Sequence, residues 1–473
     1  MPNREPYIEK TKKTPQKRVG SGAREVALGV LHQLFQHPDD GTPLPLLLMK
    51  ASQSAELGAR DIALVSELVF GVLRRSALLD ILLADFLKRP GALSPQVRIL
   101  LKVGVYEILF MDGIPSRATV SELVELGRRR FGQGLGGLVN GVLRSVDREA
   151  ERLHAKVEQS PPAEAASIPA WLMTMWSAQY GAERAASFAS NTLSHAAPCW
   201  RVNMARENAE TLRASWLERG FAPVGQHGFT SAGLDKARAG AKDEQDALAE
   251  LEASGAVSRQ GISSQLVAEM IAQRILGDAS LAKAELWDAC CGRGGKTAAL
   301  LEKGVHVTLA SDPTPFRVEE LQSSVRRLAL PVPNVKCAVE QDVDVHYPLI
   351  LLDVPCSGTG TLGRVPELRL RLTPDKLNEA ERLQGVILED AWSKLRPGGL
   401  LFYVTCALNR KENEGRIEKF LRMHGTENGG DAFLEEQRLF LPELPGHPEL
   451  VMDKETWPAT IQGVAKSLTR LSD

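Results

Sequence analysis

The feature that most constrains the fold of this chain is the alternation of short apolar runs with helical segments that begins at Gly261. Five runs follow one another in the order LWDACC, HVTLASD, VKCAVE, LILLDV and LLFYVTC, with segments of helical periodicity between them. Strands separated by helices in this way form right-handed βαβ units in a parallel sheet. Residues 261–425 are therefore predicted to form an α/β domain around a parallel sheet.

A different periodicity governs the N-terminal third of the chain. Within residues 24–148 strand-type alternation is absent, and over Ala63–Phe86 the apolar residues recur every three and four positions. Val97–Phe110 is apolar on nearly every side, which predicts a central, buried helix. We therefore expect an all-α domain over residues 24–150.

Composition marks three further segments. Residues 1–24 hold seven Lys or Arg against two acidic residues, so residues 1–23 are interpreted as a flexible basic arm that binds phosphate by counterion release. A solvated tail without a ligand is the alternative. Residues 151–167 are polar and rich in Ala and Pro, which is typical of a linker. Residues 168–260 form a small mixed α/β segment before the α/β domain.

Other classes of protein are excluded by what the sequence lacks. It holds no run of about 18 uncharged apolar residues and no apolar signal region near residue 1, so we expect a cytoplasmic protein without a membrane span. Six cysteines stand at positions 199, 290, 291, 337, 356 and 406, none of them in a C-x-x-C pair. Neither a zinc site nor a redox motif is predicted, and in a reducing compartment these cysteines stay thiols. We expect a monomer without a metal.

A glycine-rich turn follows the first strand of the α/β domain. It reads Cys290-Cys-Gly-Arg-Gly-Gly-Lys296 and leads into a helix. Glycines let the backbone approach a ligand closely, and a helix N-terminus favours a carboxylate or phosphate. Asp312, about twenty positions further on at the end of the next strand, can accept hydrogen bonds from ribose hydroxyls.

This geometry suits a nucleotide-containing cofactor, with a tight turn without a ligand as the alternative. A dinucleotide is disfavoured because G-x-G-x-x-G is absent, so S-adenosyl-L-methionine (SAM) in a Rossmann-like domain is preferred. The candidate cofactor-binding residues are Cys290, Cys291, Gly292, Arg293, Gly294, Gly295, Lys296, Asp312, Arg317, Asp342 and Asp353.

Two cysteines end neighbouring strands of the same domain. Cys356 follows Asp353-Val-Pro, and Cys406 follows Tyr403-Val-Thr. Ligands bind at the carboxyl edge of an open α/β sheet, so both thiols can face one substrate. For either cysteine alone a buried structural thiol is the commoner state. Two cysteines that end neighbouring strands at this edge favour a catalytic role.

A pair of thiols suits methylation of cytosine at C5, a carbon that is poorly reactive by itself. A thiolate that adds to C6 makes C5 nucleophilic enough to take the methyl group from SAM, and loss of the C5 proton then releases the thiol. Asp353 is placed to orient the base through its N3 and amino edge.

At these residues the sequence resembles the Sun-type family of RNA cytosine-C5 methyltransferases. The family pattern D-x-P-C-S-x-T-G stands here as residues 353–360, and Y-x-T-C as residues 403–406. The resemblance implies that Cys406 is the nucleophile and that Cys356 assists product release. DNA cytosine methyltransferases attack from a single Pro-Cys motif, which would nominate Cys356, but they have no counterpart of Thr405-Cys406.

The resemblance covers most of the chain. ALVSELVFGVLRR and LVNGVLR, in the helical domain, are similar to the NusB-type domain that part of this family carries. PAWLMTMWSAQYG and AVSRQGISSQLVA are similar to the family's intermediate RNA-binding segment and its entry to the catalytic domain. The resemblance implies small-subunit (16S) ribosomal RNA as the substrate, with the helical domain as an RNA-binding module.

The sequence departs from the family pattern at three places. Gly292-Arg293 replaces the Ala-Pro of the cofactor loop C-A-A-P-G-G-K, so we expect SAM binding with altered loop rigidity. Pro348 stands where the family has Asp, which leaves the carboxylate that faces adenine open between Asp342, which is favoured, and Glu340.

The third departure is the C-terminal end. Residues 426–473 are expected to be an atypical, partly disordered tail, because no closing strand of the family type is recognisable after Gly446. The last two dozen residues are similar to translated interspersed-repeat sequence, with a lineage-specific tail as the alternative. We therefore expect the sheet to lack a terminal strand. A catalytically impaired RNA-binding homologue is the second hypothesis for the function.

Overall fold

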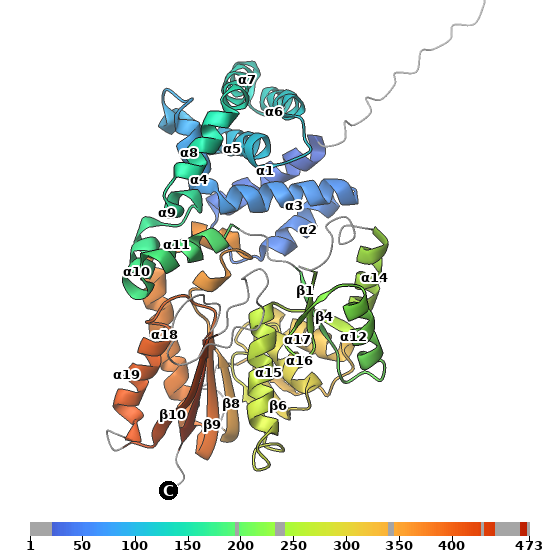
Figure 1. Cartoon of the computed structure of the whole chain (residues 1–473), viewed down its shortest axis with the longest axis vertical. Helices are drawn as coiled ribbons and strands as arrows, with labels where there is room; N and C mark the ends of the chain where they lie inside the picture. Colours follow the sequence, from blue (N-terminus) through green and yellow to red (C-terminus); the bar gives the residue numbers. More distant parts are fainter. Residues whose placement is uncertain are drawn as a thin grey trace, which may run out of the picture. The chain divides into compact units, whose positions relative to one another are not determined.

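The computed structural model describes residues 21–193, 198–231, 242–338, 345–426, 430–439 and 464–470. Contacts within the chain divide it into two compact units, Met1–Ser167 and Ile168–Asp473 (Figure 1). In these described ranges no helix is both long and apolar enough to cross a membrane.

The first unit is all-α, as predicted. Its helices are α1 (Ser21–Gln36), α2 (Leu44–Ser54), α3 (Ala59–Arg74), α4 (Ser76–Ala84), the short η1 (Pro90–Ala92), α5 (Pro95–Phe110), α6 (Ser116–Phe131), α7 (Gln133–Arg148), α8 (Ala150–Gln159) and α9 (Pro162–Ala165). α5 begins with a cap, because the Oγ of Ser94 accepts a hydrogen bond from the Val97 N–H at 3.4 Å. Apolar side chains on most of its faces are buried, which confirms the predicted central helix.

Charged side chains inside this unit are paired. Glu107 of α5 is fully buried and accepts hydrogen bonds from Arg24 of α1, at 2.9 Å from Nε, and from the hydroxyl of Thr119 on α6, at 2.6 Å. A buried carboxylate is tolerated only when such donors compensate its lost hydration. The cluster therefore ties α1, α5 and α6 together.

The expectation of a linker over residues 151–167 is wrong. These residues form most of α8 and all of α9, and they belong to the first unit. Leu153 is fully buried, so the polar composition describes the solvent face of a packed helix. The chain passes between its two units at Ser167–Ile168.

The second unit opens with a small mixed α/β segment. It comprises α10 (Ala170–Tyr180), α11 (Ala182–Asn191), β1 (Cys199–Val202), α12 (Ala209–Glu218), β2 (Ala222–Val224), β3 (Gly228–Thr230), α14 (Lys242–Ala253) and β4 (Val257–Arg259). The strands pair antiparallel in the order β2-β3-β1-β4. Its core is aromatic: the Trp216 ring meets Trp200 and Phe229 edge to face, at centroid distances of 6.0 and 5.3 Å.

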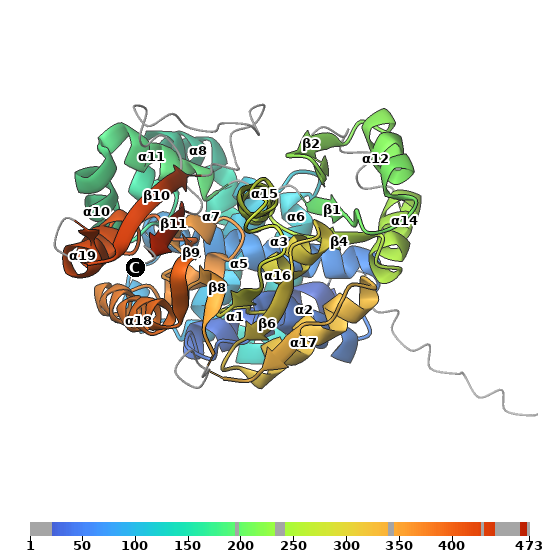
Figure 2. The same ribbon diagram turned by 90° about the horizontal axis from the view of Figure 1, so that it is seen from below.

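The α/β domain follows as predicted. Its elements are α15 (Ile262–Leu276), β5 (Leu286–Asp288), α16 (Gly295–Glu302), β6 (Val307–Ser311), α17 (Pro315–Arg327), β7 (Asn334–Lys336), β8 (Tyr347–Asp353), η4 (Thr359–Thr361), η5 (Pro366–Leu370), α18 (Pro374–Ser393), β9 (Leu395–Thr405), α19 (Glu414–His424), β10 (Ala432–Leu439) and β11 (Val464–Arg470). The sheet order is β10-β11-β9-β8-β5-β6-β7. Figure 2 labels β10, β11, β9, β8 and β6 of this sheet. β7, β6, β5, β8 and β9 are parallel, with β5 near the centre.

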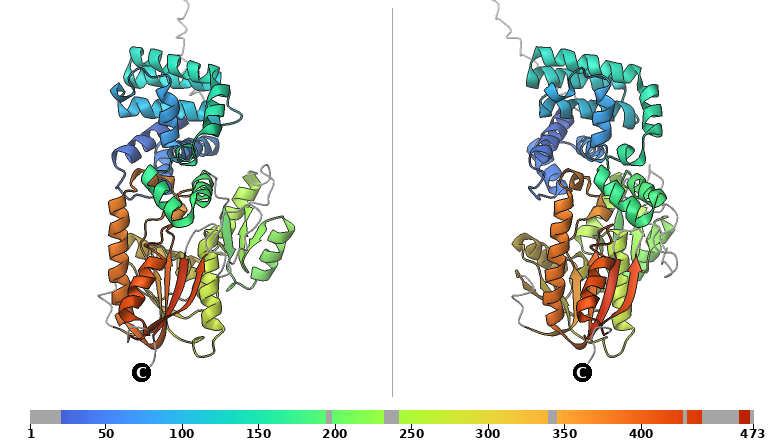
Figure 3. Two further views of the ribbon diagram at one scale, coloured as in Figure 1. Left: turned by 60° about the vertical axis from the view of Figure 1, so that its left-hand side comes forward. Right: turned by 90° about the vertical axis from the view of Figure 1, so that its left-hand side faces the viewer.

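Both faces of this sheet are covered by helices, which is the rule for parallel sheets. Alternate residues of β8 point to opposite faces: Leu349 and Leu351 pack with α15, α16 and α17, whereas Ile350 and Leu352 pack with α18 and α19. The views in Figure 3 show the small antiparallel sheet beside α15, on the side away from α18. The short apolar runs are thus strands buried on both faces.

The expectation that nothing after Gly446 pairs with the sheet is wrong. β11 lies between β9 and β10 and pairs antiparallel with both, from Val464 opposite Thr405 to Thr469 opposite Leu400 on the β9 side. The segment has few apolar residues, but strand pairing uses the backbone groups that every residue carries. The sheet therefore has its terminal strands. The interpretation of the last two dozen residues as translated interspersed-repeat sequence depended on an unpaired tail and loses its support.

Candidate active site

The candidate residues meet at one edge of the sheet. β5, β6, β8 and β9 run parallel, so the loops after all four strands emerge at the same edge. These loops carry the predicted cofactor turn, Asp312, the Asp353–Cys356 segment and Cys406. The sheet brings together residues that lie more than a hundred positions apart in the sequence.

The predicted cofactor turn requires glycine at two positions. Gly292 has φ of 53° and Gly294 has φ of 80°, in the left-handed region that side chains avoid. A Cβ on Gly294 would also lie 2.6 Å from Cγ of Leu321 on α17, so the turn passes directly against that helix. α16 begins immediately afterwards, at Gly295. This close approach leaves the backbone N–H groups of the helix start available to an anionic or polar ligand group.

The departure at Arg293 has a structural role. Its Nε lies 3.0 Å from Oε2 of Glu320, and its guanidinium lies over the Phe316 ring at 5.7 Å from the centroid. Both partners belong to α17. An exposed ion pair contributes little by itself, but the two contacts tie the turn to α17 at the position where the family pattern has a rigid proline.

A buried carboxylate lies under the turn. Asp288 ends β5 and accepts a hydrogen bond from the Thr297 hydroxyl of α16 at 2.6 Å. Burial raises its pKa to about 7, with the Thr297 hydrogen bond opposing and the nearby Asp353 carboxylate adding to the rise. Asp288 was not among the predicted site residues, although it stands two positions before Cys290. Cys291 is buried too, and burial raises the pKa of its thiol.

Asp312 is buried at the end of the second parallel strand and is held in one orientation. Its Oδ1 accepts the Thr314 N–H at 2.9 Å, and its Oδ2 lies 3.3 Å from Nη1 of Arg317. Arg317, predicted to contact the cofactor, is thus the partner of Asp312. The two candidates for the carboxylate that faces adenine, Glu340 and Asp342, lie outside the described residues.

Lys296 and Asp353 form a second ion pair at the same edge. The Lys296 ammonium lies 2.6 Å from Oδ2 of Asp353. Burial lowers the pKa of this lysine, but the attraction and hydrogen bond of Asp353 outweigh it, so the pKa is raised and the side chain stays charged. The predicted cofactor lysine and the predicted base-orienting carboxylate are therefore in direct contact.

The two candidate catalytic thiols also touch. Cys356 Sγ and Cys406 Sγ are 3.1 Å apart, and the Cys406 backbone N–H points at Cys356 Sγ at 3.3 Å. The thiol hydrogen bond to Cys406, with burial, raises the pKa of Cys356 well above its usual value. The same hydrogen bond lowers the pKa of Cys406 against the effect of burial, with help from Lys296 and Arg364. The pair therefore favours a thiolate on Cys406 and a proton on Cys356.

A carboxylate missed by the sequence analysis fixes this pair. Glu412 is fully buried and accepts hydrogen bonds from the Ser357 N–H at 2.8 Å, from Gln384 Nε2 at 2.9 Å and from Asn409 Nδ2 at 3.0 Å. These donors come from the Cys356 loop, from α18 and from the Cys406 loop. One buried group thus holds both cysteine-bearing loops. No local pattern around Glu412 distinguishes it from a surface residue.

Hydrogen bonds between the loops complete the arrangement. The Leu408 N–H donates to the Thr359 hydroxyl at 2.7 Å, and the Gly360 N–H donates to the Cys406 carbonyl at 3.0 Å. Asn413 donates to the Ala407 carbonyl at 2.9 Å and accepts from the Thr405 hydroxyl. Thr405 is therefore a support for the loop that follows Cys406, which explains the threonine before the candidate nucleophile.

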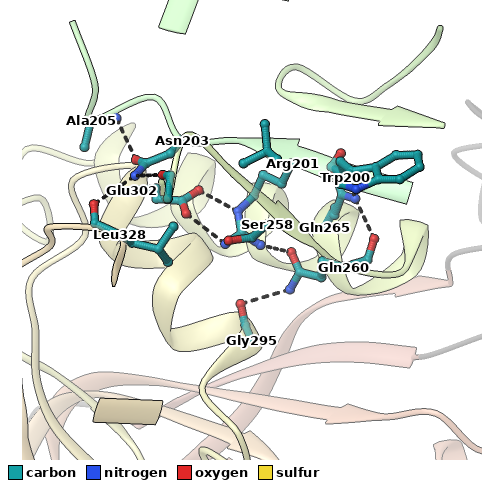
Figure 4. Close-up of polar contacts among 12 residues, drawn as sticks. Trp200, Arg201, Asn203, Ala205, Ser258, Gln260, Gln265, Gly295, Glu302 and Leu328 are labelled. Atoms are coloured by element: carbon teal, nitrogen blue, oxygen red, sulfur yellow. Dashed lines mark hydrogen bonds and ion pairs between the residues drawn. The ribbon is translucent and has the colours of Figure 1, made fainter. Parts of the chain in front are cut away.

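A polar network joins the antiparallel sheet to the cofactor turn (Figure 4). Arg201 of β1 is in a buried ion pair with Glu302, the last residue of α16, at 2.5 and 2.9 Å. Arg201 also donates to Gln260, and Gln260 donates to the Gly295 carbonyl, at the first residue of α16, at 3.0 Å. The network therefore holds α16 at both ends. Of these residues only Gly295 was selected from the sequence.

The remaining cysteines lie outside this cluster. Cys337 is exposed, and Cys199 belongs to β1. Within the part of the chain that the structure describes, no three His, Cys, Asp or Glu side chains are grouped so that they could hold a metal ion. The chemistry at the strand ends is thus that of two thiols beside a charged lysine–carboxylate pair.

The strand β5, near the centre of the sheet, leads into a glycine turn that packs against α17, and the next strand leads to an oriented carboxylate, Asp312. Such an arrangement binds the cofactor in Rossmann-like, SAM-dependent methyltransferases. The model of the family described as 16S rRNA methyltransferase RsmB/F matches residues 280–439, and that of the NusB family matches residues 21–148. The chain belongs to the RsmB/F family of rRNA methyltransferases, with a NusB-like N-terminal domain.

Relatives agree with this assignment, and a solved structure shares the fold. The chain is 33% identical to ribosomal RNA small subunit methyltransferase B of Thermus thermophilus, over 85% of this chain and 87% of that protein. It is 29% identical to the probable ribosomal RNA small subunit methyltransferase B of Bacillus subtilis, over 85% of this chain and 89% of that protein. The crystal structure of PH0851 has the same fold, with a TM-score of 0.66 at 20% identity over 96% of this chain and 99% of that one.

Proposed function

We propose that this chain transfers a methyl group from SAM to C5 of a cytosine in small-subunit (16S) ribosomal RNA, through a covalent bond between Cys406 Sγ and C6 of the base. One observation carries the proposal: the two thiols lie 3.1 Å apart, and their hydrogen bond lowers the pKa of Cys406 while it raises that of Cys356. A thiolate is the form that adds to an electron-poor carbon.

Addition and transfer follow from this ionisation. The Cys406 thiolate forms a bond to C6, and the electron pair of the C5–C6 double bond moves to C5. When bound, SAM supplies an electrophilic methyl carbon on a sulfonium that leaves as a neutral thioether. Asp353, held by Lys296 at 2.6 Å, accepts a hydrogen bond from the amino group of the base and keeps C6 in front of the sulfur.

Product release requires loss of the C5 proton and of the bond to Cys406. In the adduct, Cys406 is a neutral thioether, so the negative charge that helps to raise the pKa of Cys356 is gone. Cys356 can then release its own proton to solvent and accept the proton from C5. The electrons of the C5–H bond restore the double bond and expel the Cys406 thiolate.

The residues around the turn suit SAM. Gly294 passes against α17 where a side chain would clash, and Asp312 is a buried, oriented carboxylate at the end of the next strand. We assign Asp312 to the ribose hydroxyls, residues 290–296 to the methionine end, and Arg317 to the positioning of Asp312. The choice of 16S RNA rests on the similarity to small-subunit ribosomal RNA methyltransferases and on the NusB family match.

The alternative of a catalytically impaired RNA-binding homologue has no remaining support. It depended on missing terminal strands, and β10 and β11 occupy those places in the sheet. Lys296 of the glycine turn contacts Asp353, and Cys356, three positions after Asp353, contacts Cys406.

Covalent trapping tests the proposal. Cys406→Ala should abolish both turnover and the denaturant-stable protein–RNA adduct, because it removes the nucleophile. Cys356→Ala should accumulate the adduct, because addition proceeds and elimination does not. Cys199→Ala, a change in β1 of the antiparallel sheet, serves as the control and should turn over normally. An adduct in the Cys406→Ala protein, or none in the Cys356→Ala protein, contradicts these roles.

A further inference from the structure

Arg364 is a cation next to the nucleophile that the catalytic proposal does not use. It follows η4, eight positions after Cys356, and its charge is close enough to the Cys406 sulfur to lower the pKa of that thiol. Its Nε is buried without a hydrogen-bond partner among the described residues. Most buried polar groups have a partner, so one that lacks it calls for an explanation.

The position of this guanidinium depends on a glycine. A Cβ built on Gly261, the residue before α15, would lie 1.8 Å from Nη1 of Arg364. The backbone of Gly261 has φ of −63° and ψ of 146°, which every residue type can adopt. The absence of a side chain at Gly261 thus leaves the space that the guanidinium fills, and a Cβ there would displace the guanidinium.

Another arginine of the same loop is held by hydrogen bonds. Arg369 donates through its two Nη atoms to the Leu362 carbonyl at 2.7 Å and to the Thr192 hydroxyl at 2.6 Å, so it supports the loop although its own Nε also has no hydrogen-bond partner. Among the described residues no such hydrogen bond holds the Arg364 guanidinium, and holding a partly buried cation without an anion costs free energy. An anionic ligand that arrives with the substrate would remove this cost.

We propose that Arg364 binds a phosphodiester next to the target nucleotide and so places its base over Cys406. This inference rests on the proposed function, because the target base must lie at Cys406 for Arg364 to be within reach of its phosphates. A nucleotide that is rotated out of its stack exposes its flanking phosphates, and a guanidinium fork matches two phosphate oxygens. Arg364 is therefore a substrate-positioning residue, distinct from the groups that move protons.

Arg364→Gln should raise the KM for unmethylated RNA and lower kcat/KM about tenfold to a hundredfold, the range expected for one charge-assisted contact. SAM affinity should not change. Gly261→Ala should reproduce part of the loss while the charge is kept, because the new methyl displaces the guanidinium. Arg382→Gln is the matched control: this exposed arginine on α18 contacts its own helix at Asn378, and its loss should leave kcat/KM within twofold.

Chemical substitution of the RNA separates this role from a purely electrostatic one. Two short substrate RNAs are compared, each with one uncharged methylphosphonate, placed on one or the other side of the target nucleotide. One of the two should lower kcat/KM of the wild-type protein by a factor similar to that of Arg364→Gln. The Arg364→Gln protein should lose no more than about twofold from the same substitution, because the two changes remove one contact.

The inference is overturned if both proteins lose the same factor at each linkage. It is also overturned if Arg364→Gln only raises the pH at which Cys406 is alkylated and leaves the KM for RNA unchanged, since the charge then acts on the thiolate alone. Failure of the proposed function gives a different result, because the wild-type protein itself would then not methylate the RNA.

Discussion

Replacing Arg201 by methionine tests whether the buried ion pair between β1 and α16 stabilises the second unit. Arg201 and Glu302 contact through two hydrogen bonds at 2.5 and 2.9 Å, and their side chains are 4% and 2% exposed (Figure 4). The substitution leaves the Glu302 carboxylate buried without its cation. It also removes the donor that Arg201 supplies to Gln260.

The expected loss is large. Breaking one partner out of a buried pair costs about 3–5 kcal/mol, because the remaining charge keeps its desolvation penalty. That is a substantial fraction of a typical unfolding free energy of about 5–15 kcal/mol. With a urea m-value near 3 kcal/mol/M, the upper end of the usual range, the midpoint of unfolding should fall by roughly 1 to 2 M.

Tryptophan fluorescence reports this transition selectively. The sequence contains seven tryptophans, the first of them at position 171, so all seven belong to the second unit. Arg213→Met is the control, because its ion pair with Glu210 on α12 is exposed at 3.3 Å and should contribute less than about 1 kcal/mol.

The double variant Arg201→Met/Glu302→Leu tests whether the unpaired Glu302 carboxylate causes the loss of stability. Removing both charges leaves neither one unpaired, so this protein should be more stable than Arg201→Met alone. The stabilising role of the buried ion pair is refuted if the double variant is less stable than Arg201→Met. It is also refuted if Arg201→Met lowers the midpoint of unfolding no more than the Arg213→Met control.

Three further predictions concern the site and the helical domain. Asp312→Ala should weaken SAM binding about tenfold to a hundredfold, the loss of one charge-assisted hydrogen bond; calorimetry that finds unchanged affinity excludes the ribose role. Cys356→Ala should shift the pH midpoint of Cys406 alkylation by iodoacetamide upward, because the hydrogen bond that lowers the pKa of Cys406 is removed; an unshifted midpoint, followed by mass spectrometry, contradicts the ionisation assigned to the pair. Deleting residues 1–167, the first unit, should weaken RNA binding and reduce its salt dependence while SAM binding is retained; an unchanged salt slope would make that unit a scaffold.

Much of the fold could be predicted because its signals are local. The five apolar runs of the α/β domain became β5 to β9, and the all-round apolar segment 97–110 became the buried helix α5. Burial on both faces of a strand, or on most faces of a helix, leaves a continuous apolar run that needs no knowledge of partners.

The errors arose where the signal is not local. The tail strand β11 is held by backbone hydrogen bonds to β9 and β10, which leave little trace in composition. Helix α8 has a polar solvent face and one fully buried leucine, Leu153, so its composition resembles that of a linker. Propensity is a weak guide when tertiary packing decides.

The candidate site shows the same division. Cys356 and Cys406 could be paired from their flanking motifs, and the structure places their sulfurs 3.1 Å apart. Glu412, Gln260 and Arg364 could not be found, because each acts through contacts to segments distant in the chain. Glutamate, glutamine and arginine are common on any surface, and only the surroundings of these three side chains in the folded chain distinguish them.

Methyl transfer to C5 of a cytosine through Cys406 is tested by incubating the purified protein with unmethylated 16S RNA and methyl-labelled SAM. The RNA is then digested to nucleosides, and the labelled product is identified by mass spectrometry. We expect label in 5-methylcytidine at one site with the wild-type protein and none with Cys406→Ala. Label in another nucleoside, or 5-methylcytidine formed equally well by Cys406→Ala, would contradict it.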